Sequence, residues 1–390
     1  MAAQSEMSDL PAYLQLFAAL AAAPERRSMR RTGGAETNAI DPAIYIDPAR
    51  FERERALIRR SPIVVAHASE IPDAGALLAH DHLGIPILLA RGRDGAVRAF
   101  LNACRHRNTK LIRPGPALRK PSIVCPYHGW TYGLDGTLMN VPDEEHFPGL
   151  DKSCHGLVSL PCAVRGGLVF VVSDPGGVLD IDRALGSLTE DFAAFGLPTS
   201  VVFRKVERIK KTNWKLIVDA FQDGYHIQHL HRKSIAPYFK DTCAISERVG
   251  DNIRALVARL PFDEVKGLSP RQWDIREHAS YSHYVFPNTV LIMHPDYISV
   301  IGLFPLSSGE TMYVHSLLTP RIPQSDKERD HYERSFELIE NGVFQAEDLD
   351  VCERAQAAIE GGARWPMTIG AYEQGIAQFH AILDEALRRA

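Results

Sequence analysis

The segment Cys104-Arg105-His106 is followed, after eighteen residues, by Cys125-Pro126-Tyr127-His128. Together the two segments supply two thiolates and two imidazoles as matched Cys/His pairs. A Rieske [2Fe–2S] centre uses this ligand set, with two cysteines on one iron and two histidines on the other. A structural zinc site can also be Cys2His2, but zinc fingers usually place both cysteines in one knuckle and both histidines in the other. The mixed pairs therefore favour an iron–sulfur cluster over zinc.

The residues around both pairs resemble a known family. Ala99 to Arg107 and Cys125 to Trp130 are similar to the Rieske domain of the oxygenase (alpha) subunits of Rieske non-haem iron ring-hydroxylating oxygenases. The spacer, which includes Pro114-Gly115-Pro116, is slightly longer than the family usually shows, and we interpret the extra residues as a surface loop. The resemblance implies four cluster ligands: Cys104, His106, Cys125 and His128.

A second group of metal-ligating residue types lies between Asp219 and His231. These thirteen residues contain two aspartates and three histidines. On a helix, His226 would share a face with Asp223, three residues earlier. His231 comes five residues after His226, so a bend or helix end near Gln228 is needed to bring both imidazoles to one metal. Two histidines and one carboxylate form the facial triad of non-haem Fe(II) oxygenases.

The family resemblance assigns roles within this group. His226 and His231 match the ligands of the mononuclear iron. Asp223 matches a carboxylate that, in the family's trimers, links an iron-binding histidine to a Rieske histidine of the neighbouring subunit. His229 matches no family position and is interpreted as a spectator. Many relatives carry Glu-Asn where this chain has Asp219-Ala220, so the polar contact that this asparagine makes near the iron is left unassigned.

The third iron ligand should be an anionic oxygen from elsewhere, because Asp223 is already engaged. The segment Phe344 to Gln356 resembles the family's C-terminal Glu-Asp box, in which the position of the ligand is Asp348. Glu347 and Asp350 are acidic neighbours that could be mistaken for it, since the motif is short. By itself, this acidic run would predict only a solvated helix face.

The 390 residues are enough for two domains, and the two metal motifs fall in separate halves. We predict an N-terminal helix and linker in residues 1–39, packed on the catalytic body or on a neighbouring subunit. A Rieske domain should follow in residues 40–176, with strands joined by turns such as Asp94-Gly95 and Asp135-Gly136. Residues 177–390 should form the catalytic domain.

The catalytic half mixes helices with strands and predicts an α+β fold, for which the resemblance implies a helix-grip-like arrangement. Three sequential antiparallel strands are predicted at Tyr281 to Met293, Tyr297 to Phe304 and Thr311 to Leu318. Two helices should follow, at Ser325 to Gln356 and Ile369 to Arg389. The N-terminal half is predicted to be all-β.

Composition narrows the class of protein. The net charge is −4, with both signs spread along the chain, which argues against a nucleic-acid partner. The six cysteines are scattered rather than arranged as a disulfide framework, so a reducing cytoplasm is the expected compartment. Leu10 to Ala23 follows no basic segment and is too short to span a bilayer, so we expect an amphipathic helix rather than a signal peptide or membrane anchor.

These features predict a terminal oxygenase that passes electrons from the cluster to a mononuclear Fe(II), which activates O2 to hydroxylate an aromatic or related small organic substrate. The chain has no Gly-rich nucleotide fingerprint. We therefore expect a separate reductase or ferredoxin, with NAD(P)H required only indirectly. The resemblance implies a homotrimer, with or without β-subunits.

Two alternatives remain open from the sequence. The same metals could serve a monooxygenase or demethylase acting on an N-methyl, O-methyl or quaternary ammonium substrate. Outside the enzyme class, the chain could be a Rieske electron carrier or a zinc-binding module. Four apolar residues are candidates for the substrate pocket, although each is more often simply core: Phe221, Tyr284, Phe286 and Met293.

Overall fold

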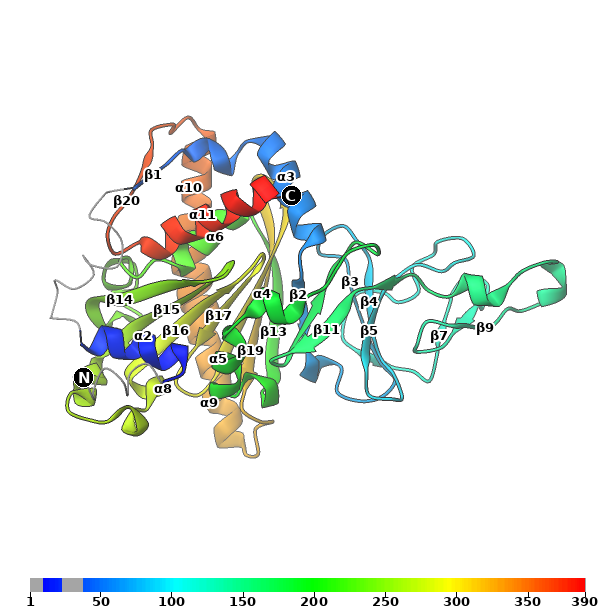
Figure 1. The fold of residues 1–390 in the computed structure, drawn as a ribbon, viewed down its shortest axis with the longest axis horizontal. Coiled ribbons are helices and arrows are strands. Elements are labelled where there is room, and N and C mark those ends of the chain that lie inside the picture. Colours follow the sequence, from blue (N-terminus) through cyan, green and yellow to red (C-terminus); the bar gives the residue numbers. More distant parts are fainter. Residues whose placement is uncertain (1–9, 23–37, 390) are drawn as a thin grey trace. The chain divides into compact units, whose positions relative to one another are not determined.

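The computed structural model describes residues 10–22 and 38–389. Its contacts divide the chain into two compact units (Figure 1). Residues 58–181 form one unit, and the described residues before 58 and after 181 form the other. The first unit is dominated by strands and the second combines a large sheet with helices. The predicted α+β class, with an all-β N-terminal domain, is confirmed.

The unit of residues 58–181, all of which are described, contains three antiparallel sheets with strand orders β10-β5-β4-β3-β6, β11-β12-β2 and β7-β8-β9. The predicted turns are confirmed, because Gly95 and Gly136 adopt φ angles of 81° and 87° between paired strands. The strands are β2 (Ile63–His67), β3 (Ala76–His80), β4 (Ile87–Arg91), β5 (Val97–Leu101), β6 (Leu118–Arg119), β7 (Ile123–Val124), β8 (Thr131–Tyr132), β9 (Leu138–Asn140), β10 (Ser159–Leu160), β11 (Cys162–Arg165) and β12 (Leu168–Val171).

The second unit is organised around a seven-stranded antiparallel sheet of order β13-β19-β18-β17-β16-β15-β14. One predicted strand, Tyr281 to Met293, is in fact two paired antiparallel strands joined by a turn at residues 286–288. The strands are β13 (Val201–Lys210), β14 (Phe239–Val249), β15 (Asn252–Arg259), β16 (Ala279–Val285), β17 (Thr289–Met293), β18 (Ile298–Ser307) and β19 (Glu310–Thr319).

Helices cover this sheet, and Figure 1 shows the segment from α9 through α10 (orange) running along the strands. The predicted helix Ser325 to Gln356 is continuous but changes type, because a π-helix at Glu337–Asp348 separates α9 from α10. The α-helices that lie wholly or mostly in this unit are α2 (Ala12–Ala21), α3 (Pro48–Arg60), α4 (Ile181–Leu185), α5 (Leu188–Ala194), α6 (Trp214–Phe221), α7 (Ile227–Leu230), α8 (Ile275–His278), α9 (Asp326–Phe336), α10 (Leu349–Glu360) and α11 (Gln374–Arg389).

The N-terminal helix docks on its own chain. In α2, the ring of Phe17 lies 5.0 Å from Trp273 and 5.1 Å from Phe262, and the Tyr281 hydroxyl donates to the carbonyl of Tyr13 at 2.8 Å. The linker predicted to follow this helix, within residues 1–39, lies almost entirely outside the described residues. No described helix has both the length and the apolar character needed to cross a membrane.

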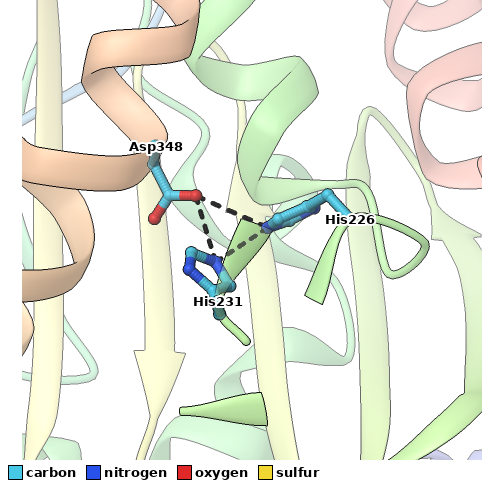
Figure 2. Close-up of side chains that lie close together, drawn as sticks. All are labelled: His226, His231 and Asp348. Carbon is cyan, nitrogen blue, oxygen red and sulfur yellow. Dashed lines mark hydrogen bonds and ion pairs between the residues drawn. The ribbon is translucent and has the colours of Figure 1, made fainter. Parts of the chain in front are cut away.

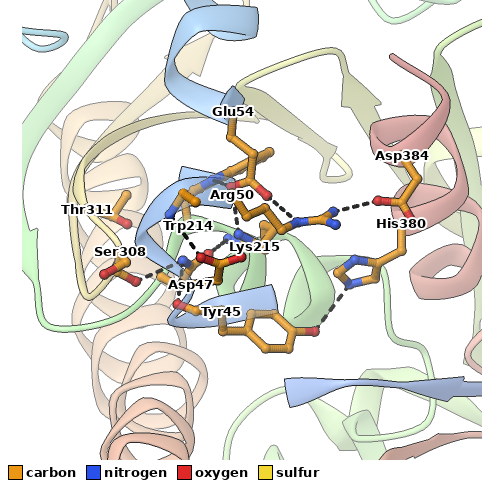
Figure 3. Close-up of polar contacts among 12 residues, drawn as sticks. Tyr45, Asp47, Arg50, Glu54, Trp214, Lys215, Ser308, Thr311, His380 and Asp384 are labelled. Atoms are coloured by element: carbon orange, nitrogen blue, oxygen red, sulfur yellow. Dashed lines mark hydrogen bonds and ion pairs between the residues drawn. The ribbon is translucent and has the colours of Figure 1, made fainter. Parts of the chain in front are cut away.

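The boundary between the units differs from the predicted one, because residues 38–57 belong with the catalytic unit. Strand β1 (Asn38–Ile40) pairs with β20 (Met367–Ile369). Farther along, α3 carries Glu54 and Arg50 into a network of polar contacts with α6 and α11 (Figure 3). Glu54 accepts from the Lys215 ammonium at 2.7 Å, and Arg50 pairs with Asp384 at 2.6 Å. These partners lie more than 150 residues away in sequence, so no local pattern could place the boundary.

The Glu54 carboxylate is fully buried, and it also accepts from the Trp214 indole at 3.1 Å and from Arg50 at 2.8 Å. Burial lowers the pKa of Lys215, although Glu54 opposes this shift. Removing one partner of a buried ion pair leaves the other charge without compensation in a medium of low dielectric. The pair therefore ties the N-terminal segment to the helix that leads into the second metal motif.

We predict that Glu54→Ala lowers the apparent free energy of unfolding by about 3–5 kcal/mol, because Lys215 remains buried and unpaired. The check is the urea midpoint of holoprotein followed by tryptophan fluorescence. Glu52→Ala is the control, since Glu52 belongs to an exposed pair with Arg55 and should cost under about 1 kcal/mol. Replacing both partners, as Glu54→Leu with Lys215→Met, should recover much of the loss. Equal midpoints for Glu54→Ala and Glu52→Ala would contradict the prediction.

Candidate metal centres

The two Cys/His pairs lie on loops with the same local geometry. The amide of Asn108 donates to the carbonyl of Cys104 at 2.9 Å, and the amide of Gly129 donates to that of Cys125 at 3.1 Å. Asn108 and Gly129 both adopt left-handed backbone angles, with φ of 58° and 74°. Asparagine and glycine tolerate this conformation best. Each loop therefore turns back four residues after its cysteine and leaves the histidine near the tip.

The four predicted cluster ligands come together. Cys104 and Cys125 are buried in the core of the unit, whereas His106 is half-buried and His128 is exposed. The two imidazole rings lie 4.6 Å apart. Within this fully described unit, His106 Nδ1 is buried without a hydrogen-bond partner. Burial raises the pKa of the Cys104 thiol, and Cys125 adds to the shift. Two buried thiols and a buried imidazole nitrogen without a partner fit an iron–sulfur cluster, which would satisfy these atoms.

Neighbouring side chains support the loops. The Trp130 ring stacks on His106 at 4.9 Å, with only 8° between the planes. The Tyr132 hydroxyl lies 3.2 Å from Cys104 Sγ and accepts a hydrogen bond from the amide of Arg105 at 2.9 Å. Residues 113–120 of the spacer are exposed and include the edge strand β6, so the segment around Pro114-Gly115-Pro116 lies at the surface.

The second metal motif brings three side chains to one point (Figure 2). His226 follows the break after α6, His231 follows the four-residue helix α7, and Asp348 ends the π-helix. Nε2 of His226 lies 3.0 Å from Nε2 of His231, and Oδ1 of Asp348 lies 3.4 Å and 3.2 Å from these nitrogens. His226 and His231 are the N-cap and C-cap residues of α7, so this four-residue helix ends between them, at Leu230, two residues after the predicted position at Gln228. The break at residues 222–226 separates α6 from α7 and precedes both histidines.

A second carboxylate faces the far nitrogen of each imidazole. Asp223 Oδ2 lies 3.1 Å from His226 Nδ1. Glu347 Oε2 lies 2.7 Å from His231 Nδ1 and also accepts from the Ser234 hydroxyl at 2.6 Å. A proton held on Nδ1 by a carboxylate leaves the Nε2 lone pair free, and metal-binding histidines use this arrangement. The contact from Glu347 was not anticipated, because the sequence offered Glu347 only as a rival to Asp348.

The donor set fits a bound cation. Two imidazole lone pairs and a carboxylate oxygen would repel one another at these distances, and adjacent octahedral ligands at about 2.1 Å from a metal are roughly 3 Å apart. Burial lowers the pKa of His226, but Asp223 and Asp348 outweigh it and raise the pKa to about 10. Burial of Asp348 raises its pKa, but the two histidines outweigh it and hold the pKa below its usual value. The negative surroundings therefore attract positive charge to this point.

The π-helix explains how Asp348 reaches the site. Leu338, Val343 and Asp348 are spaced five residues apart, and all three line one cavity. A π-helix repeats its hydrogen bonds every five residues, whereas an α-helix repeats them every four. Residues five apart can therefore share a face here. Single π-turns are often found at functional sites.

A cavity of about 370 Å³ opens beside the three side chains, and its walls are mainly apolar. Of the four pocket candidates, Phe221 lines it. Tyr284 shares the face of β16 with Ser282, but α11 covers it there, and its ring lies 5.1 Å from Phe379. Met293 is fully buried, and Phe286 is half-buried beside Tyr284. Among the described residues, these three are not part of the cavity wall.

Two family sequence profiles match this chain. The profile "Ring hydroxylating alpha subunit (catalytic domain)" matches residues 198–389, and the profile "Rieske [2Fe-2S] domain" matches residues 61–159. The chain belongs to the Rieske oxygenase alpha subunits. A Rieske [2Fe–2S] cluster and a mononuclear iron are therefore its cofactors, and its electrons come from a reductase.

Curated relatives of this alpha subunit include both monooxygenases and a dioxygenase. The carnitine monooxygenase oxygenase subunit of Escherichia coli (strain K12) is 28% identical over 364 residues, covering 90% of this chain and 94% of the relative. The chloroplastic choline monooxygenase of Spinacia oleracea is 27% identical, covering 88% and 77%. Biphenyl 2,3-dioxygenase subunit alpha of Rhodococcus jostii (strain RHA1) is 34% identical but covers only 49% and 42%.

Solved structures show the same fold. The quaternary ammonium Rieske monooxygenase CntA, in complex with L-carnitine, superposes with a TM-score of 0.77 at 23% identity, covering 93% of this chain and 99% of that one. Naphthalene 1,2-dioxygenase from Rhodococcus sp. gives a TM-score of 0.75 at 20% identity, covering 90% and 94%. The two-domain arrangement predicted from the metal motifs is thus shared by monooxygenases and dioxygenases.

We predict that Tyr132→Phe lowers the reduction potential of the Rieske cluster. Hydrogen bonds to the cluster's sulfur ligands favour its reduced, more negative state. Loss of one such bond, at about 0.5–1.5 kcal/mol, corresponds to roughly 20–60 mV for a one-electron couple. Protein-film voltammetry measures the shift. Tyr127→Phe is the matched control, because its exposed hydroxyl contacts Arg107 instead. A potential unchanged in Tyr132→Phe, or lowered equally in both variants, would contradict the role.

Proposed function

We propose that this oxygenase inserts one atom of O2 into a C–H bond of a small organic molecule bound beside His226, His231 and Asp348. Two electrons and two protons reduce the other oxygen atom to water, so one alcohol and one water form for each O2 consumed. The electrons arrive singly from a separate reductase or ferredoxin. The convergence of three donor atoms in the wall of a mainly apolar cavity carries this proposal.

The residues divide the work between two centres. Cys104, His106, Cys125 and His128 hold the cluster. His226, His231 and Asp348 hold the mononuclear iron, and this iron supplies the activation of O2 when it is bound. Asp223 and Glu347 orient the two imidazoles from behind. The apolar wall limits the water that can compete with the substrate.

Monooxygenation is favoured over dioxygenation by the relatives that match most of the chain. The carnitine and choline monooxygenases align over 90% and 88% of it, whereas the biphenyl dioxygenase aligns over 49%. Dihydroxylation of an arene is the second candidate, because Phe221, Ile292 and Phe344 give the cavity an apolar wall that suits an aromatic ring. The number of oxygen atoms incorporated separates the two reactions.

The position of Asp223 suits a role in electron transfer between subunits. Its carboxylate contacts an iron-binding imidazole, yet the side chain keeps 15% of its surface exposed. A group from outside this chain could therefore reach it. We propose that a Rieske histidine of a neighbouring subunit in a homotrimer makes this contact. A carboxylate shared by two imidazoles would couple the two metal centres through a short path of hydrogen bonds.

The oxygenase reaction is tested with purified holoprotein, a surrogate reductase and ¹⁸O2, over a panel of small organic acids, amines and arenes. We expect one ¹⁸O atom in each product and one O2 consumed for every two electrons delivered. Two labelled oxygens in the product would establish dihydroxylation instead. Iron-replete protein that oxidises no member of the panel would contradict the proposal.

The role of Asp223 predicts that Asp223→Ala keeps both metal centres but loses roughly 10- to 100-fold in turnover, the range for loss of a supporting carboxylate. Iron and sulfide analysis and the cluster's visible spectrum report the metals, and stopped-flow reoxidation of the reduced cluster reports electron transfer. Asp350→Ala is the control, because Asp350 is exposed and pairs with Arg354. Rapid reoxidation in Asp223→Ala would refute the bridge, whereas loss of iron would indicate a purely structural carboxylate.

A further inference from the structure

Four residues that are distant in sequence line the cavity at one end of the sheet. Arg259 ends β15, Ser280 is near the start of β16, His294 follows β17, and Tyr297 precedes β18. Because neighbouring strands in this sheet are antiparallel, the end of one strand lies beside the start of the next. The sheet therefore gathers a polar group from separate segments into the same cavity as the metal site.

Arg259 stands out within this group because of what surrounds its guanidinium. The side chain is half-buried, its Nη1 lies 3.5 Å from the Ser280 hydroxyl, and its Cζ lies 5.4 Å from the centre of the Phe239 ring. Arg259 forms no ion pair with any described residue. Among the described residues of the cavity wall, no other lysine or arginine occurs.

Other buried arginines of this unit are satisfied by the protein. Arg254 pairs with Asp191 at 2.6 Å and also with Glu247. Arg276 donates to three carbonyl oxygens, those of His294, Phe195 and Tyr297, at 2.7–3.0 Å. The chain thus surrounds these two guanidinium groups with acceptors, whereas Arg259 lines the cavity and the one hydrogen bond of its guanidinium to a described residue is the 3.5 Å contact with Ser280.

The acidic residue nearest in the cavity wall, Asp296, forms its ion pair with a residue other than Arg259. Asp296 also lines the cavity, but its carboxylate pairs with His331 at 2.5 Å and keeps 45% of its surface exposed. Burial lowers the pKa of Arg259, and Tyr297, Tyr238 and Asp296 offset only part of this effect. Among the described residues no carboxylate pairs directly with Arg259, so its guanidinium is available to an anion that enters the cavity.

We propose that Arg259 binds the carboxylate of an organic-acid substrate while an apolar part of that substrate faces the mononuclear iron site. A single guanidinium matches a singly charged carboxylate and offers it two parallel hydrogen bonds. A doubly charged phosphate ester would need a second cation that the described wall does not contain. This inference rests on the proposed oxygenase function and adds the class of substrate.

The test compares monocarboxylic acids with their primary amides, which have nearly the same shape without the charge. Benzoate, 3-phenylpropionate and hexanoate, each matched with its amide, are titrated into iron-replete holoprotein by calorimetry in chloride-free buffer and assayed for coupled O2 uptake. We expect at least one acid to bind at least 10-fold more tightly than its amide. In Arg259→Gln this acid should lose roughly 10- to 150-fold in affinity, the range for a hydrogen-bonded charge, while its amide is unaffected.

Two further variants separate recognition from structure. Arg259→Lys keeps the charge but loses the forked geometry, so it should retain part of the preference for acid over amide. Arg204→Gln removes a surface charge paired with Glu333 at 2.7 Å and should leave the preference unchanged. A general disturbance of the fold would weaken acids and amides alike and would not change their ratio.

The outcomes distinguish this inference from the oxygenase function. If the protein oxidises neutral or cationic compounds and Arg259→Gln does not alter the acid-to-amide ratio, the anion site is refuted while the oxygenase function stands. The site is also refuted if none of the acids binds measurably at concentrations up to about 10 mM, which is 10-fold above a Kd of about 1 mM. Inorganic phosphate binding more tightly than the carboxylates would also overturn the assignment. Failure of iron loading and of all O2 consumption would instead refute the oxygenase function.

Discussion

The catalytic unit depends on holding three electron-rich atoms close together: the Nε2 atoms of His226 and His231 and an oxygen of Asp348, separated by 3.0–3.4 Å. Their mutual repulsion must be offset by a cation and by rigid support. The four-residue helix α7 holds His226 and His231 at its two ends, and the π-helix carries Asp348 to both of them. Carboxylates on the outer side of each imidazole complete the support. The metal site is therefore a product of two unusual features of helices, each of which would be unfavourable elsewhere.

The features that could be predicted from the sequence are those whose metal-ligating residues lie close together along the chain. Each Cys/His pair lies within four residues, and turn residues such as Gly129 follow at a fixed offset, so the cluster loops were recognisable. His226 and His231 are five residues apart, which made a helix break necessary and therefore predictable. Asp348 lies more than 100 residues away and was found only through a family resemblance. The ligand roles of all these residues stay predictions, although the structure brings their side chains together.

The parts that could not be predicted depend on distant partners or on an uncommon backbone. Residues 38–57 join the catalytic unit because Glu54 pairs with Lys215 and Arg50 pairs with Asp384. No sequence pattern within residues 38–57 predicts these distant contacts. In the π-helix, residues five apart share a face, whereas an α-helical pattern groups residues three or four apart. The sequence pattern therefore could not assign Leu338 and Val343 to the cavity wall. Arg259 belongs to a strand whose neighbours are known only once the sheet order is known.

The metal site and Arg259 lie in different layers of the catalytic unit, the helices and the sheet. Their separation bears on which substrates fit the cavity. The predicted iron ligands come from helical segments, whereas Arg259 comes from the sheet. The layers are held together by close packing: the rings of Phe344 in the π-helix and His315 in β19 meet edge to face at 5.2 Å, and the Ser282 hydroxyl in β16 donates to the carbonyl of Phe221 at 3.3 Å. Because protein interiors are dense and resist deformation, this packing sets the span between the metal site and the guanidinium. Under the proposed binding of a carboxylate at Arg259, an acid that is too short or too long would satisfy one end but not both, so the core residues between the layers would select the position of the carbon that is oxidised.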